Sequence, residues 1–213
     1  MKIRSTSMLQ DGLDRDFSWR IKEIASLGLV LRTARRPMAD TYVRAAVPLL
    51  YAHWEGFIKY AAISYANFVL NQRHTFDELS ECFIVLGLNR YLNQYQNIEK
   101  SAIRIGLVKA ILKEIKGRAA FNPDHAGDTK SNLSSDVFER IAIGIGIDAK
   151  PYHSRYHLID ESLLKRRNMI AHGEYLAIDA NGYRTLADDV LQLMRRFKTD
   201  IENASSLKRY LRI

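Results

Sequence analysis

The feature that most constrains the fold is a long stretch, residues 39–72, in which apolar side chains recur every three or four positions. The positions that share this spacing are Val43, Val47, Leu50, Trp54, Phe57, Ala61, Tyr65 and Phe68. This is the period of an α-helix, which would be roughly 50 Å long. An apolar seam of that length needs another long helix to cover it. Pro48 lies inside the stretch and removes a backbone hydrogen bond to Arg44, so we expect a bend there.

The remainder of the chain also predicts helices. Only four prolines and eleven glycines interrupt the 213 residues, and the two-residue alternation typical of strands is nearly absent. Further helices are predicted over residues 14–35, 76–88, 98–116, 135–145, 158–172 and 185–205. In the 98–116 helix we expect a buried apolar stripe made of Ile98, Ile105, Val108, Leu112 and Ile115. The sequence therefore predicts an all-α protein.

Local signals set several expected boundaries. Pro37 should end the first helix, because proline disfavours helical geometry in the residue before it. We expect Asp160 to cap the start of the 158–172 helix and Gly173 to follow its end. The pair Asn181-Gly182 predicts a hairpin turn before the last helix.

We expect one helical domain over residues 14–205. Residues 1–13 should form a flexible N-terminal tail, and residues 206–213 a basic C-terminal tail. Residues 117–134 are rich in turn formers and poor in apolar side chains, which predicts a mobile loop.

The composition indicates an anionic partner and a reducing compartment. Lysine and arginine exceed aspartate and glutamate by 32 to 24, a formal charge of +8, and nucleic acid is the obvious anion. Cys82 is the only cysteine, so neither an internal disulfide nor a cysteine-based zinc site is expected, which favours the cytoplasm. The apolar runs are too short to span a bilayer, and we expect no membrane association.

Several catalytic classes lack their signatures. The sequence has no P-loop, no dinucleotide-binding glycine motif, no Gly-x-Ser-x-Gly and no His-Glu-x-x-His. His153 and His157 are four residues apart, but no carboxylate or cysteine clusters with them. We therefore expect no metal site and no cofactor.

The segment most suggestive of chemistry runs from Lys165 to Glu174, at the end of a predicted helix. Asn168 and His172 are four residues apart and share a helix face. Arg167 lies about 140° round the helix from His172. It could meet the same ligand by its length, by unwinding near the helix end, or across a dimer interface. A histidine that titrates near neutral pH beside a guanidinium suits acid–base chemistry on a phosphodiester. By spacing alone, a helix end with a solvated basic face explains these residues equally well.

Residues 167–173, Arg-Asn-Met-Ile-Ala-His-Gly, resemble the R-N-x-x-x-H signature of the HEPN superfamily of small helical domains. Residues 54–59, Trp-Glu-Gly-Phe-Ile-Lys, are similar to an element of a prokaryotic HEPN subgroup found among defence and toxin–antitoxin genes. The resemblance implies a HEPN-type bundle with two long N-terminal helices and the motif on the helix second from the C-terminus.

The resemblance also implies a metal-independent endoribonuclease that acts as a homodimer, with the two motifs facing each other. Arg167 would stabilise the developing phosphorane charge, His172 would act as general base or acid, and Asn168 would orient the phosphate or the histidine. Attack by the 2′-hydroxyl would leave a 2′,3′-cyclic phosphate. The main alternatives are a non-catalytic HEPN module that binds RNA or nucleotide or scaffolds a partner, and a helical adaptor without a nucleic-acid role.

Other residues have two interpretations each. Glu55 would lie under the motif helix and bind Arg167 or His172, or would only pair with Lys59. Lys165 and Arg166 would contact RNA phosphates, or form a solvated charge run. The resemblance further implies a cognate regulator or antitoxin, for which a nucleotidyltransferase or a Toprim-like protein is a candidate. Relatives regulated by a nucleotidyltransferase carry a tyrosine where this chain has Glu174, so regulation by tyrosine modification is not expected here.

Overall fold

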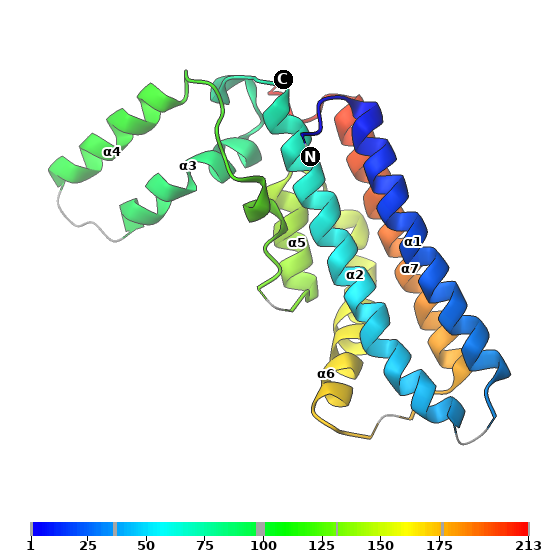
Figure 1. The fold of residues 1–213 in the computed structure, drawn as a ribbon. Coiled ribbons are helices and arrows are strands. Elements are labelled where there is room, and N and C mark those ends of the chain that lie inside the picture. Colours follow the sequence, from blue (N-terminus) through cyan, green and yellow to red (C-terminus); the bar gives the residue numbers. More distant parts are fainter. Residues whose placement is uncertain (1, 36–37, 97–100, 131, 176, 213) are drawn as a thin grey trace.

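Three long helices form the body of the computed structural model, which describes all residues except 1, 36–37, 97–100, 131, 176 and 213. They are α1 (Thr6–Thr33), α2 (Met38–Asn71) and α7 (Ala180–Ser206), and they lie side by side, with α1 antiparallel to the other two (Figure 1). Among the described residues the only β-pairings are two isolated bridges. The prediction of an all-α bundle is therefore confirmed.

Helix α2 is the spine of the molecule, as its periodicity predicted. It continues as one helix through Pro48. The large seam residues Trp54, Phe57 and Tyr65 are at most 1% exposed. Trp54 packs against Phe138 of α5 (Ser135–Gly144), with ring centroids 5.4 Å apart. Burying such rings is among the largest favourable contributions a core can contain, so α2 fixes the positions of the elements around it. In the described part of the chain, no helix has both the length and the apolar character needed to cross a membrane.

An arm of two helices, α3 (Glu81–Gln96) and α4 (Ser101–Glu114), projects from one end of the bundle (Figure 1). The single helix predicted over 76–88 is instead a 3-10 turn, η1 (Phe76–Glu78), followed by α3. The buried stripe predicted for α4 was wrong, because α4 has no buried residue and packs only through its inner side. Ile98 lies outside the described residues, and Ile115 is partly buried.

The chain returns to the bundle through α5, the 3-10 helix η3 (Lys150–Arg155), the π-helix η4 (Leu158–Leu164) and α6 (Lys165–Ala171). The prediction that Asp160 caps the start of its own helix was wrong. Asp160 accepts hydrogen bonds from the backbone N–H, at 2.8 Å, and the hydroxyl of Ser135, and so ties η4 to the first turn of α5. Gly173 follows α6 with φ +78°, as predicted for the residue after a helix end.

The expected termini and turns differ from the structure. Helix α1 begins at Thr6 rather than after residue 13, because Leu9 and Leu13 continue its apolar face and are fully buried. Tyr210, in the expected C-terminal tail, is buried. Asn181-Gly182 forms the first turn of α7 rather than a hairpin, because the Asp179 side chain caps that helix. The described residues of the segment 117–134 contain no α-helix, as expected, but they include the short helix η2 (Pro123–Gly127), which packs on α2.

Candidate active site

Helix α6 carries the predicted motif and stands at the end of the molecule opposite the α3–α4 arm (Figure 1). It continues directly from η4, whose Ile159 and Leu163 are 1% exposed and anchor it to the core. The helix ends at His172, where two backbone hydrogen bonds and the left-handed Gly173 close it as a Schellman motif. Since none of the α6 residues is buried, the motif lies at the surface, where a large ligand can reach it.

Arg167 is held by neutral groups. Its Nη1 donates to the side-chain oxygens of Asn168, at 2.7 Å, and Asn132, at 3.0 Å. Its guanidinium carbon lies 4.6 Å from the centre of the Tyr51 ring, a cation–π contact. Within the described residues no carboxylate pairs with Arg167, so the contacts orient the guanidinium while its positive charge stays available to an anion.

Tyr51, beneath Arg167, joins α2 to the segment 129–133. The side chain is 2% exposed, and its hydroxyl accepts a hydrogen bond of 2.6 Å from the backbone N–H of Leu133. The Glu55 carboxylate lies close enough to this hydroxyl to help raise its pKa, and it accepts a hydrogen bond of 2.7 Å from Thr129. Burial is the main cause that raises the pKa of Tyr51 to about 12. The phenol therefore stays protonated at physiological pH.

His172 is exposed and is the C-cap residue of α6. Its backbone N–H donates to the carbonyl of Asn168 at 2.9 Å. In the described part of the chain, its ring makes no hydrogen bond or ion pair, so both ring nitrogens are open to a ligand. The structure places His172 and Arg167 at the same helix end without joining them.

The other predicted site residues have different surroundings. Glu55 does not bind Arg167 or His172 directly, and it does not pair with Lys59. Its contact with the motif runs through Tyr51. Lys165 forms an exposed ion pair of 2.7 Å with Glu161, which raises the pKa of Lys165. An RNA phosphate would have to compete with that carboxylate.

A surface hollow lies beside the motif. Arg166, Arg44 and Tyr175 line it together with two carboxylates, Asp40 and Asp179, so its lining has no excess of positive charge. The Arg44 guanidinium donates to the carbonyl of Glu174 at 3.0 Å and so holds the chain just after the motif. Of the two basic residues predicted to contact RNA, Lys165 pairs with Glu161 and Arg166 lines this hollow.

Three residues that contact or support the motif were not predicted from the sequence: Tyr51, Thr129 and Asn132. Tyr51 lies in the core helix, where an aromatic residue predicts packing only. Thr129 and Asn132 lie in the segment expected to be a mobile loop. No spacing in the sequence indicates that they meet α6 or its support.

Among the described residues there is no group of three histidine, cysteine or carboxylate side chains that could hold a metal ion. The pair His153 and His157 is not an exception. The Nε2 atom of His153 lies 3.3 Å from Oε1 of Glu139, a residue of α5. The arrangement at α6 therefore has a cation, an amide and an imidazole as its chemical groups.

Comparison with known proteins identifies a family. The family model described as RiboL-PSP-HEPN matches residues 15–203, which is nearly the whole chain. No curated protein and no solved structure matches. The matched region includes α6 and every residue that contacts Arg167.

Proposed function

Because the chain belongs to the RiboL-PSP-HEPN family, we propose that it is an endoribonuclease whose site is built on Arg167, Asn168 and His172. The observation that carries the proposal is the state of Arg167. It is fixed by an aromatic ring and two amide oxygens, carries no carboxylate counter-ion in the described residues, and stands at an exposed helix end with an unpaired histidine. Fixed positive charge of this kind stabilises charge that develops during reaction.

The proposed reaction needs no metal ion. The ribose 2′-oxygen attacks the adjacent phosphorus, and the bond from phosphorus to the 5′-oxygen breaks. One imidazole accepts the 2′-hydroxyl proton, and another acid gives a proton to the departing 5′-oxygen. The products are a 2′,3′-cyclic phosphate and a 5′-hydroxyl. Arg167 would bind the non-bridging oxygens, with Asn168 fixing its direction.

We propose that the active form is a homodimer. Each subunit contributes one His172, whereas the reaction needs a base at the 2′-oxygen and an acid at the 5′-oxygen. Two copies of α6 that face each other would supply both groups, together with two Arg167 guanidinium groups. The net charge of +8 on each chain would then assist RNA binding, with Lys165 and Arg166 beside the cleft.

We further propose that this ribonuclease acts in the cytoplasm as the effector of a prokaryotic defence or toxin–antitoxin system, held in check by a cognate regulator. The support is the resemblance of residues 54–59 and 167–172 to a HEPN subgroup from such gene neighbourhoods. A neighbouring gene for a nucleotidyltransferase or a Toprim-like protein would identify the regulator.

The test of catalysis is an RNA cleavage assay in EDTA with the wild type and the variants His172→Ala, Arg167→Ala and Asn168→Ala. We expect cleavage by the wild type and its loss in the first two, with unchanged circular dichroism. RNA binding without cleavage, weakened by salt, would instead identify a non-catalytic module. Neither binding nor cleavage would leave only an adaptor role.

The dimer is tested by mixing. If one site needs both motif copies, an excess of His172→Ala subunits draws wild-type subunits into mixed dimers and lowers their activity. Activity that depends only on the amount of wild-type subunit would contradict a shared site. Wild-type protein mixed with the same volume of buffer controls for dilution.

A further inference from the structure

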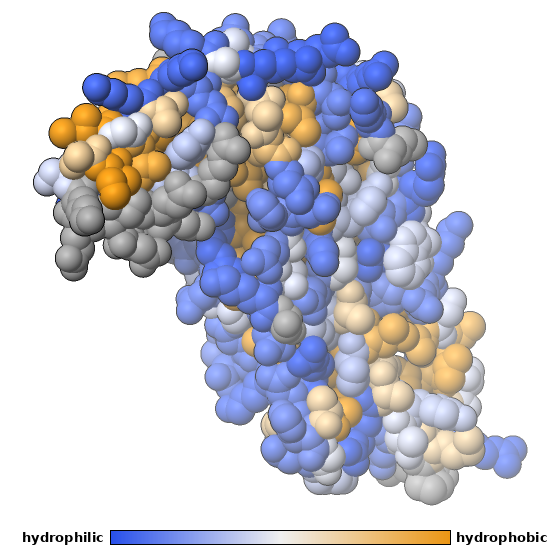
Figure 2. Space-filling model, turned by 60° about the vertical axis from the view of Figure 1, so that its left-hand side comes forward, coloured by the Kyte–Doolittle hydropathy of each residue, from blue (hydrophilic) through white to orange (hydrophobic). Residues whose placement is uncertain are grey.

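Helix α4 presents an apolar face that is exposed in the described part of the chain. Its inner side packs on α3, where Tyr91 hydrogen-bonds Glu114. Its outer side carries Ile105, Val108 and Leu112, which are 57%, 45% and 63% exposed. We call these three residues the α4 stripe. Figure 2 shows apolar surface on the arm, in contrast to the mainly hydrophilic surface around it.

The α4 stripe has the spacing found in helices that bind in an apolar groove of another protein. Its residues occupy positions i, i+3 and i+7, which lie within about 60° of the helix circumference and extend about 10 Å along the axis. This is the pattern by which an amphipathic helix inserts side chains into an apolar groove of another protein. Ile105 and Val108 are β-branched and stiff, so they lose little side-chain freedom on binding.

The base of the arm is fixed, so the stripe is presented in a defined direction. The backbone N–H of Phe76 donates to Gly117 at 3.1 Å, and that of Asp77 donates to Ile115 at 3.0 Å. An isolated β-bridge between Thr75 and Arg118 lies beside these bonds. Helix α4 is therefore attached to the body by its C-terminal end and not only through α3.

The charges around the stripe specify the partner. On an ideal helix Lys109 and Lys113 border the stripe on one side. Both are exposed. The only acidic residue of α4 is Glu114, which is on the inner side. A second copy docked through the same face would place these cations against each other, so the complementary surface is acidic.

We propose that the α4 stripe is the docking face for a second protein, one that presents an apolar groove bordered by aspartate and glutamate. A membrane fits less well, because α4 has no aromatic side chain to lie at a lipid interface. The stripe lies at the opposite end of the molecule from α6 (Figure 1), and the docking does not depend on whether the chain cleaves RNA.

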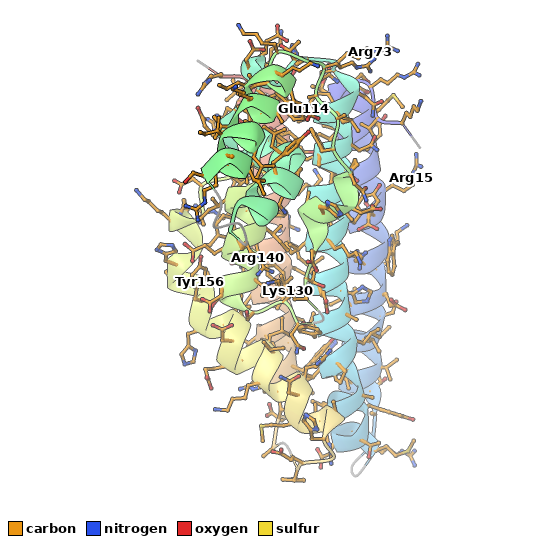
Figure 3. The ribbon with its side chains drawn as sticks, turned by 90° about the vertical axis from the view of Figure 1, so that its left-hand side faces the viewer. Arg15, Arg73, Glu114, Lys130, Arg140 and Tyr156 are labelled. Atoms are coloured by element: carbon orange, nitrogen blue, oxygen red, sulfur yellow. The ribbon has the colours of Figure 1, made fainter. Side chains whose placement is uncertain are left out.

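The test begins with a photo-crosslinking amino acid in the full chain, expressed in its native host. It replaces Lys109 beside the stripe, and in a matched control it replaces Arg15, which projects from α1 (Figure 3). A protein joined only through position 109 is identified by mass spectrometry, produced and purified. Its binding is then measured against the wild type and three variants: Leu112→Asp, Lys109→Glu and the control Leu29→Asp. Leu29 is an equally exposed leucine on α1, at 55%.

We expect Leu112→Asp to weaken binding roughly tenfold or more, as loss of an apolar anchor does. Lys109→Glu alone, and added salt with the wild type, should each weaken binding as well, whereas Leu29→Asp should leave it unchanged. RNA cleavage by Leu112→Asp should equal that of the wild type. Crosslinks only to a second copy or to lipid, no crosslinked protein, or equal binding by all variants would each overturn the proposal.

Discussion

The substitution Tyr51→Phe separates the two roles of the residue under Arg167. The ring remains, so the contact at 4.6 Å with the guanidinium is kept. The hydroxyl is lost, so the Leu133 N–H has no acceptor. Leu133 is fully buried, which excludes water as a substitute acceptor. Tyr51→Phe should therefore reduce stability more than activity.

The size of the effect follows from the buried N–H. An unsatisfied buried donor costs about 1–3 kcal/mol. For a chain of about this length each kcal/mol changes Tm by about 2–4 °C, so we expect Tm to fall by about 2–12 °C. Thermal unfolding followed by circular dichroism measures it. Tyr60→Phe is the matched control on α2, because the Tyr60 hydroxyl makes a single long hydrogen bond among the described residues, of 3.3 Å to the Gly12 carbonyl of α1. We expect it to melt close to the wild type.

An activity assay tests whether the Tyr51 ring positions Arg167. Tyr51→Leu removes the ring, and a cation–π contact is worth about 0.5–2 kcal/mol. If the ring positions Arg167 for the reaction, kcat should fall roughly two- to thirtyfold, while Tyr51→Phe stays near wild type when assayed below its Tm. The reasoning is refuted if Tyr51→Phe melts with the wild type, or if Tyr51→Leu retains full kcat.

Three further predictions concern stability. Burial lowers the pKa of His53 below its ordinary value, so the unfolded chain takes up a proton that the native state lacks, and Tm should fall as pH drops below about 6.5. His53→Gln should flatten that dependence in thermal melts, and an unchanged slope would exclude His53 as its cause. Gly87→Ala places a methyl 2.2 Å from the buried Phe76 ring and should cost about 1–3 kcal/mol by denaturant unfolding. Gly127→Ala meets Ile63 at 2.8 Å and should displace the segment that supports the site, lowering cleavage as well as stability; unaltered cleavage would contradict that coupling.

The long helices were predictable because their apolar period is strong. Helix α2 was expected over residues 39–72 and spans Met38–Asn71. Helix α1 was placed too late, although Leu9 and Leu13 extend the same four-residue spacing back from Phe17. For α4 the period predicted an apolar face but could not show whether another element covers that face. The prediction that the stripe is buried was wrong for that reason.

The motif residues were predictable, and their support was not. The motif residues lie within six positions of one another, so a local sequence pattern can identify Arg167, Asn168 and His172 together. Asn132 meets Arg167 across 35 residues, and Leu133 meets Tyr51 across 82. Contacts of that range depend on how α2, segment 129–133 and α6 pack, which local patterns do not specify. The indirect position of Glu55, through Tyr51, has the same origin.

The most direct measurement is the chemistry of the RNA ends produced in EDTA. Mass spectrometry of a short RNA cut by the wild type should show a 2′,3′-cyclic phosphate on one product and a 5′-hydroxyl on the other. The same RNA with 2′-deoxyribose at the cleaved position, or incubated with His172→Ala, should remain intact. Products with a 5′-phosphate, or cleavage that survives either change, would contradict 2′-hydroxyl attack assisted by Arg167 and His172.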